Sequence, residues 1–258
     1  MSLTHTLLQE DVLEAIQLIK PKIEEVKTSI EETTHGVNRR PADVRLIAVT
    51  KYHSVAYAAA AVHLGITDLA ENRVEPFLAR QELINRYCIE HGLPEPRWHY
   101  VGSLQRNKVK QLGGKMDAFH ALDSLRLAKR INLIYTRMGE VLPVYLQLNV
   151  TGEESKHGFE LSELYEVWGD LTELPGIRIA GLMTMAEREA SVGRLHETFS
   201  KLAQTGNELT NRLRSGGYMA DNEKLRLSMG MSGDYISAIK EGATDIRLGS
   251  ALFGPSKP

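Results

Sequence analysis

The sequence contains very little cysteine, few aromatic residues and almost no net charge. One cysteine, Cys88, among 258 residues excludes an internal disulfide framework and suits a reducing compartment. Lysine and arginine (31) nearly balance aspartate and glutamate (33), so bulk charge gives no reason to expect nucleic acid or an acidic membrane as a partner. No window approaches eighteen uninterrupted apolar residues, and acidic residues interrupt the first fifteen positions where a signal peptide needs an apolar core. We therefore expect a cytoplasmic protein without nucleic-acid or membrane partners.

Closely spaced metal ligands are also absent from the sequence. The nine histidines form no HExxH or HxH pair, and one cysteine cannot assemble a zinc cluster. No GxGxxG follows a predicted strand, and the GGKM at 113–116 lacks the Ser or Thr of a phosphate-binding P-loop. We expect no metal site and no nucleotide-binding motif of these types.

The first forty residues carry a helical pattern. Apolar residues recur at spacings of three and four, at Val12, Ile16, Ile19, Ile23, Val26 and Ile30. Pro21 interrupts this run and should bend or split the helix. We expect residues 1–40 to form a helical segment packed on the rest of the chain rather than a coiled coil, because there are few heptads.

From residue 45 onward, short apolar runs alternate with helical stretches. The candidate strands cover residues 45–51, 68–72, 98–104, 118–124, 143–150, 178–185, 225–231 and 245–254. Between several of them lie amphipathic runs with a serine in front and a glycine behind, which is typical of crossover helices. Eight such units in about 250 residues predict a parallel (β/α)8 barrel, with an open doubly wound sheet as the alternative. No linker divides the chain, so we expect residues 1–258 to form one domain.

A lysine ends the first predicted strand, in the stretch RLIAVTK. Functional groups of a barrel gather where strands end, and Lys51 is the only lysine among those positions. An amine partly stripped of water loses its charge more readily and can attack an aldehyde. The alternative is a lysine that reaches out of the strand to pair with Glu71 or Asp123. The first interpretation needs a second feature beside it.

That second feature is a set of glycines and serines at the last two strands. The stretches SMGMSGD (228–234) and RLGSALFG (247–254) place Ser232, Gly233, Gly249 and Ser250 where barrels often bind phosphate. Ordinary turn and capping chemistry is the alternative. Closure of a barrel puts the first and last strands side by side, so an aldehyde and a phosphate on one ligand could reach both features. Pyridoxal 5′-phosphate (PLP) has that shape, although Schiff-base aldolases also combine a barrel lysine with a phosphate site.

The sequence resembles the pyridoxal phosphate homeostasis protein family. The resemblance covers most of the chain and rests on LIAVTK, LAENRV, WHYVGSLQRNKVK (98–110), GLMTM (181–185), LSMGMSGD (227–234) and IRLGSALFG (246–254). It implies a TIM barrel of the alanine racemase N-terminal domain type, preceded by an extra helix. It also implies PLP binding and a role in vitamin B6 and amino and keto acid homeostasis. We expect a monomer that holds PLP and supplies it to apo-enzymes.

The resemblance implies a role for each candidate site residue. Lys51 would form the Schiff base, Ser232, Gly233 and the backbone of Gly249 and Ser250 would hold the phosphate, Asn72 would support the ring, and Arg247 would face the pyridine nitrogen. An arginine there can only donate, which leaves the ring nitrogen unprotonated and the ring a weaker electron sink. From sequence alone, an ion pair of Arg247 with Asp245 or Asp123 is the alternative.

No catalytic residue is assigned from the sequence. A PLP-dependent alanine racemase needs a second acid/base on the opposite ring face, supplied by a tyrosine of an additional domain, and this chain ends at Pro258, four residues beyond the last motif. We therefore expect no dedicated catalytic activity, with an amino acid racemase of narrow substrate range as the alternative. His99 is interpreted as a core histidine, and the stripe Met183, Met185, Met229 and Met231 as barrel packing.

Overall fold

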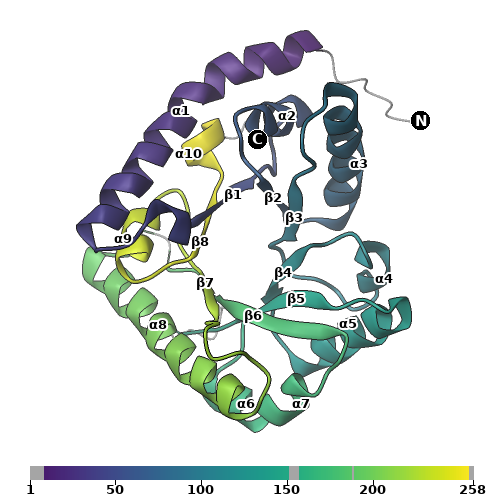
Figure 1. Cartoon of the computed structure of the whole chain (residues 1–258), viewed down its shortest axis with the longest axis vertical. Helices are drawn as coiled ribbons and strands as arrows, with labels where there is room; N and C mark the ends of the chain where they lie inside the picture. Colours follow the sequence, from purple (N-terminus) through teal and green to yellow (C-terminus); the bar gives the residue numbers. More distant parts are fainter. Residues whose placement is uncertain (1–8, 151–156, 188, 256–258) are drawn as a thin grey trace.

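Eight parallel strands form a closed barrel with helices on its outside (Figure 1). The computed structural model describes residues 9–150, 157–187 and 189–255. The strands are β1 (Arg45–Val49), β2 (Asp68–Glu71), β3 (Arg97–Tyr100), β4 (Ala118–Leu122), β5 (Leu142–Gln147), β6 (Ile177–Met183), β7 (Arg226–Ser228) and β8 (Asp245–Leu248). The helices are α1 (Gln9–Gly36), the 3-10 turn η1 (Pro41–Asp43), α2 (Val55–His63), α3 (Val74–His91), α4 (Val109–Leu112), α5 (Leu125–Met138), α6 (Leu161–Glu166), α7 (Trp168–Thr172), α8 (Val192–Ser215), α9 (Tyr235–Lys240) and α10 (Ser250–Phe253).

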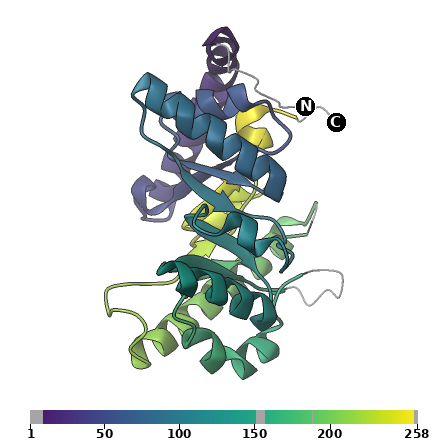
Figure 2. The ribbon, with the colours of Figure 1, turned by 90° about the vertical axis from the view of Figure 1, so that its right-hand side faces the viewer.

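Strands β1 and β8 pair in parallel and close the barrel. Their register sets Leu46 beside Ile246 and Ala48 beside Leu248. Each strand neighbours the next one along the chain, so all the strand carboxyl ends lie on one rim. The predicted barrel is confirmed, and the open doubly wound sheet is wrong. In the side view of Figure 2, the loop that follows β6 lies at one end of the barrel, and the loop that precedes β7 lies at the other end.

The predicted last strand is too long. Strand β8 ends at Leu248, and Ser250–Phe253 form the short helix α10 instead. The backbone turns at Gly249, whose carbonyl accepts hydrogen bonds from the N–H groups of Leu252 and Phe253. The short apolar run SALF fits a buried strand and a buried helical turn equally well, so its pattern could not separate them.

Helix α1 covers one side of the barrel. It contacts α2, α9 and α10, and its buried residues include Val12, Ile19 and Ile23 from the predicted apolar face. The predicted split at Pro21 is wrong, because the helix continues through this residue. Pro21 lies on the exposed side, where water can satisfy the carbonyl that loses its helical partner.

The alanine-rich helix α2 lets α1 approach the barrel closely. Ala58, Ala59, Ala60 and Ala61 are fully buried, because their short side chains leave room for helices and strands on several sides. Within the described residues, none of the helices has the length and apolar character needed to cross a membrane.

Candidate functional site

A cavity of ≈ 860 Å³ lies at the carboxyl ends of the strands. Its lining brings together residues that follow β1, β2, β7 and β8 along the chain. All seven residues predicted for the site line it: Lys51, Asn72, Ser232, Gly233, Arg247, Gly249 and Ser250. The positions that sequence reasoning placed at separate strand ends therefore form one continuous surface.

Lys51 lies in the tight turn that follows β1, rather than in the strand itself. Strand β1 ends at Val49, and Tyr52 adopts a left-handed backbone conformation with φ 66°, which is uncommon for a residue with a side chain. The Nζ atom of Lys51 lies 5.7 Å from the centre of the Tyr52 ring. The turn directs a half-buried amine and an exposed aromatic ring toward the same cavity.

Glu71 and Arg80 fix the position of this turn through hydrogen bonds and an ion pair. The hydroxyl of Thr50 donates to Glu71 over 2.6 Å, and Arg80 lies 2.8 Å from the same carboxylate. Arg80 also donates to the backbone carbonyl of His53 over 2.9 Å. The alternative in which Lys51 pairs with Glu71 is wrong, because the buried Glu71 carboxylate is bound by Thr50 and Arg80.

Ser232 and Gly233 follow β7, and Gly249 and Ser250 follow β8, so these pairs lie on neighbouring strands. The Ser232 Oγ accepts hydrogen bonds from the N–H groups of Gly249 and Ala251, at 3.2 and 3.1 Å. Within the described residues, the N–H groups of Gly233 and Ser250 have no hydrogen-bond acceptor. A Cβ added at Gly233 would meet nothing within 4 Å. These donors beside open space fit the oxygens of an anion.

Arg247 reaches the cavity from inside the barrel and is only 5% exposed. It donates to the Ser228 hydroxyl over 2.7 Å and to the Thr184 carbonyl over 3.1 Å. Burial lowers the pKa of Arg247 to about 10, so the side chain still carries its proton at neutral pH and can only donate. The alternative ion pair with Asp245 is wrong, because that carboxylate is bound by Arg226 at 2.8 Å.

Asn72 follows β2 and is held through its backbone. Its carbonyl accepts a hydrogen bond of 3.2 Å from the Tyr100 hydroxyl. A Cβ added at Gly102 would lie 2.1 Å from the same carbonyl oxygen, so only glycine allows the two loops to approach this closely. Sequence reasoning missed Gly102, although an isolated glycine inside the predicted strand 98–104 was a usable signal for a close approach of two backbones.

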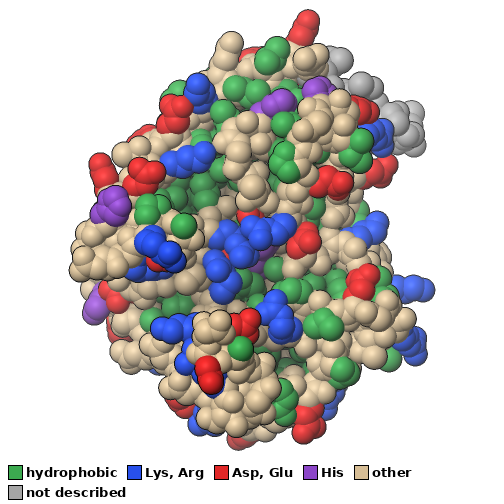
Figure 3. All heavy atoms as spheres, in the orientation of Figure 1, with side chains coloured by type: hydrophobic (Ala, Val, Ile, Leu, Met, Phe, Trp, Pro, Cys, Tyr) green, Lys and Arg blue, Asp and Glu red, His purple; other side chains and the backbone are tan. Residues whose placement is uncertain are grey.

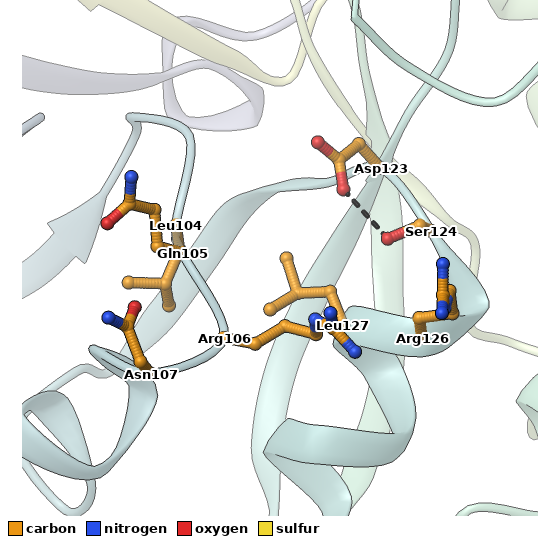
Figure 4. A pocket seen from close by; sticks show the side chains of 8 residues that line it. All are labelled: Leu104, Gln105, Arg106, Asn107, Asp123, Ser124, Arg126 and Leu127. Carbon is orange, nitrogen blue, oxygen red and sulfur yellow. Dashed lines mark hydrogen bonds between the residues drawn. The ribbon is translucent and has the colours of Figure 1, made fainter.

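Two polar residues from other strand ends lie outside this cavity. Gln105 and Asp123 line a separate pocket between the loop after β3 and the start of α5 (Figure 4). Asp123 accepts a hydrogen bond of 3.1 Å from Ser124. The sequence left open an ion pair of Asp123 with Lys51 or with Arg247. In the described part of the structure, Asp123 pairs with neither residue.

Several lining residues were not predicted. Gln147 and Thr184 line the cavity, and Gln147 donates to the His157 carbonyl over 2.8 Å. A glutamine within the apolar run PVYLQLNV was the available signal. The barrel-packing interpretation holds for the buried Met183 and Met229. It is wrong for Met185 and Met231, which follow the strand ends and line the cavity, 43% and 37% exposed.

His99 lies in the barrel interior and not in the lining of the cavity. The ring is 1% exposed and makes hydrogen-bond contacts with Asp68 and His120, as expected of a core histidine.

Comparison with known proteins gives concordant results. A family model for the alanine racemase N-terminal domain matches residues 29–257. The pyridoxal phosphate homeostasis protein of Synechocystis sp. is 35% identical over 214 residues, which cover 83% of this chain and 92% of that protein. The structure of PipY from Synechococcus elongatus PCC7942 with PLP bound is 30% identical, with a TM-score of 0.72 over 87% of this chain and 100% of PipY. An alanine racemase from Clostridium difficile 630, 16% identical, shares the fold with a TM-score of 0.65 over 94% of this chain and 58% of the racemase.

Proposed function

The chain belongs to the pyridoxal phosphate homeostasis protein family, within the wider alanine racemase N-terminal domain family, and from that premise we propose that it binds PLP in the cavity at the carboxyl ends of the strands. The observation that carries the proposal is the meeting of a lysine amine, unpaired backbone N–H groups and a buried arginine in one cavity. Bound PLP supplies an aldehyde that bonds amines and a ring that takes up electrons.

The residues present fit this cofactor. Lys51 would hold the cofactor covalently, since a primary amine bonds an aldehyde with release of water. The phosphate would be held by Ser232, Gly233, Gly249 and Ser250. The free N–H groups of Gly233 and Ser250 are the backbone donors available for it. The hydroxyl of Ser232 already orders the start of α10 by accepting from Gly249.

The remaining two site residues act on the ring. Asn72 would support the ring, and Arg247 would donate to the ring nitrogen. Because the guanidinium keeps its proton, the ring nitrogen would stay unprotonated and the ring would withdraw electrons weakly. This supports a protein that stores PLP and supplies it to apo-enzymes, without a dedicated turnover of amino acids.

The proposal includes the state of the protein in the cell. We infer that residues 1–258 act as a single PLP-binding domain, a cytoplasmic monomer in which α1 covers the side of the barrel. The contacts of α1 with α2, α9 and α10 support this arrangement. Sedimentation of the purified protein at cellular concentrations tests the monomer, and a stable dimer would contradict it.

The covalent bond to Lys51 is tested by trapping. Protein incubated with PLP and reduced with borohydride should carry a pyridoxyl group on the peptide that contains Lys51, and Lys51→Ala should lose both this group and the yellow colour. Lys110→Ala is the matched control, since this exposed lysine lies on α4 away from the cavity. Retention of a trapped pyridoxyl group on another lysine in Lys51→Ala would contradict the assignment, whereas an unchanged melting temperature shows that the fold survives.

Storage and supply are separated from catalysis by two further measurements. Loaded protein should activate a PLP-free enzyme in the presence of a scavenger that captures free PLP. Exchange of the amino acid α-proton in D₂O should stay near the rate of PLP alone. Exchange at enzyme-like rates would instead favour a racemase, and activation abolished by the scavenger would exclude direct transfer.

A further inference from the structure

A continuous line of polar side chains crosses the inside of the barrel. The His99 Nε2 lies 2.8 Å from Asp68 Oδ1, and its Nδ1 lies 2.9 Å from the Nε2 of His120. The Nδ1 of His120 lies 2.8 Å from the Ser228 hydroxyl, which accepts from Arg247 over 2.7 Å. The line begins at the amino-terminal end of β2 and ends at the guanidinium that lines the cavity.

Every member of this line is withdrawn from water. Asp68 and His99 are 1% exposed, His120 and Ser228 are fully buried, and Arg247 is 5% exposed. The five residues come from five different strands, so the contacts exist only in the closed barrel. Without water to exchange partners, each hydrogen bond must have one defined donor.

The directions of the hydrogen bonds follow from the two ends. An ionised Asp68 can only accept, so His99 donates through Nε2 and, when neutral, accepts through Nδ1. The neighbouring His120 must then donate through Nε2 and accept through Nδ1, which requires Ser228 to donate its hydroxyl proton. Arg247 can only donate, and the Ser228 oxygen accepts from it. All four hydrogens therefore point away from the cavity, toward Asp68.

The electrostatics agree with this assignment at Asp68 and at His120. Burial opposes ionisation of Asp68, but hydrogen bonds from His99, Arg97 and Thr67 outweigh it and hold the pKa of Asp68 well below its usual value. Burial, followed by the charges of neighbouring groups, holds the pKa of His120 well below the usual histidine value. His120 is also fixed in orientation, because its ring stacks on Tyr145 with centroids 4.0 Å apart.

We propose that Asp68, His99, His120 and Ser228 are positioning residues, and that their directed hydrogen-bond chain holds the Arg247 guanidinium as a donor facing the cavity. The carboxylate at one end of the barrel thereby fixes the tautomers of both histidines and the hydroxyl orientation that Arg247 meets at the other end. Among the five residues of the hydrogen-bond chain, only Arg247 presents donors to the cavity, because the hydrogens of the bonds between them all point toward Asp68. The direction of the chain is independent of PLP, whereas its consequence for a ring nitrogen rests on the proposed function.

The PLP-free protein gives the first test. In long-range ¹H–¹⁵N spectra, the imidazoles of His99 and His120 should both carry a proton on Nε2 and none on Nδ1. Signals are assigned by comparison with single histidine variants. A cationic His120, or a His120 protonated on Nδ1, overturns the proposal.

Asp68→Asn should reverse the direction of the hydrogen bonds along the chain, including those of residues that Asp68 does not contact. Thr67 and Arg97 both donate to Oδ2, so they retain the amide oxygen there and turn the NH₂ group toward His99. Both imidazoles should then switch to the Nδ1–H tautomer, including His120, which Asp68 does not contact. Asp117→Asn is the matched control, because this carboxylate at the same end accepts from the Trp98 N–H and lies outside the chain. An unchanged His120 tautomer in folded Asp68→Asn protein overturns the proposal; if that variant fails to fold, the spectra of the unmodified protein still decide.

Ser228→Ala tests the consequence at the cavity. With PLP labelled with ¹⁵N in its ring, loss of the Ser228 oxygen should shift the ring-nitrogen resonance toward that of unbound, unprotonated PLP and weaken PLP binding roughly tenfold. Ser228→Thr should restore both, since it keeps the hydroxyl. A resonance unchanged in Ser228→Ala would show that the chain does not position Arg247. Failure of the unmodified protein to bind PLP would instead contradict the proposed function and leave the tautomer result standing.

Discussion

The two ends of the barrel hold basic side chains in opposite circumstances. At the amino-terminal end, Lys and Arg side chains gather over the centre of the face (Figure 3), and the pockets there are lined by Arg45, Arg97 and Arg226. Arg97 lies 2.8 Å from the buried Asp68, Arg226 lies 2.8 Å from the buried Asp245, and Arg45 lies within 4 Å of both carboxylates. Each of these three cations is therefore paired with a buried carboxylate of the protein.

At the carboxyl end, the cations have no such partners. Among the residues that the structure describes, neither Lys51 nor Arg247 forms an ion pair, although both line the cavity. A buried cation without a counter-charge raises the free energy of the folded protein unless something else binds it. The two ends therefore differ in that the arginines at the amino-terminal end are paired with carboxylates, whereas Lys51 and Arg247 at the carboxyl end are not, within the described part of the chain.

The largest expected effect comes from making the same change at both ends. Arg226→Met removes the nearer of the two arginines that pair with Asp245 and leaves the more distant Arg45, and we expect it to lower the free energy of unfolding by about 3 kcal/mol. Arg247→Met removes a buried cation without a carboxylate partner, so we expect a change below about 1 kcal/mol in PLP-free protein. Urea unfolding measures both.

Ligand binding should show the reverse order. Arg247→Met should weaken PLP binding, whereas folded Arg226→Met should bind PLP as the unmodified protein does. Equal losses of stability at the two ends would break the comparison.

The phosphate end of the cavity gives the next effect in size. Ser232→Ala removes one hydroxyl from the proposed phosphate-binding site, and a hydrogen bond to a charged group contributes about 1.5–3 kcal/mol. The preference for PLP over pyridoxal, measured as a ratio of dissociation constants, should therefore fall roughly 10- to 100-fold. Ser191→Ala is the control, since Ser191 caps α8 by accepting from the Arg194 N–H and lies outside the cavity. A preference that survives in Ser232→Ala would place the phosphate elsewhere.

The smallest effect concerns the backbone that shapes the cavity. Gly102→Ala places a Cβ against the carbonyl of Asn72, and overpacking of this kind costs about 1–3 kcal/mol of stability. Thermal unfolding measures this cost, and PLP binding should weaken with it because the Asn72 loop must move. Gly36→Ala is the matched control, because its Cβ would meet nothing within 4 Å and its φ is not positive. Equal melting temperatures for the two variants would show that the approach of the two loops is not needed.

Much of the site could be predicted because the carboxyl ends of the strands of a parallel barrel lie together on one rim. Lys51 stood out as the only lysine at a predicted strand end, and Gly233 and Gly249 stood out as glycines beside serines. The residues inside the barrel gave no such signal. His99 and His120 are separated by twenty-one positions, and a buried histidine in an apolar run does not reveal its partners.

The sequence itself determined the order of strands and helices, the covering helix and the position of Lys51, since apolar periodicity and strand-end residues are local properties. The tertiary structure decided which charges are paired. Asp245 lies two positions before Arg247 on the same strand, but its carboxylate is bound by Arg226 of the neighbouring strand β7 at 2.8 Å. Distances between strands, which no local pattern encodes, therefore left Arg247 for the cavity.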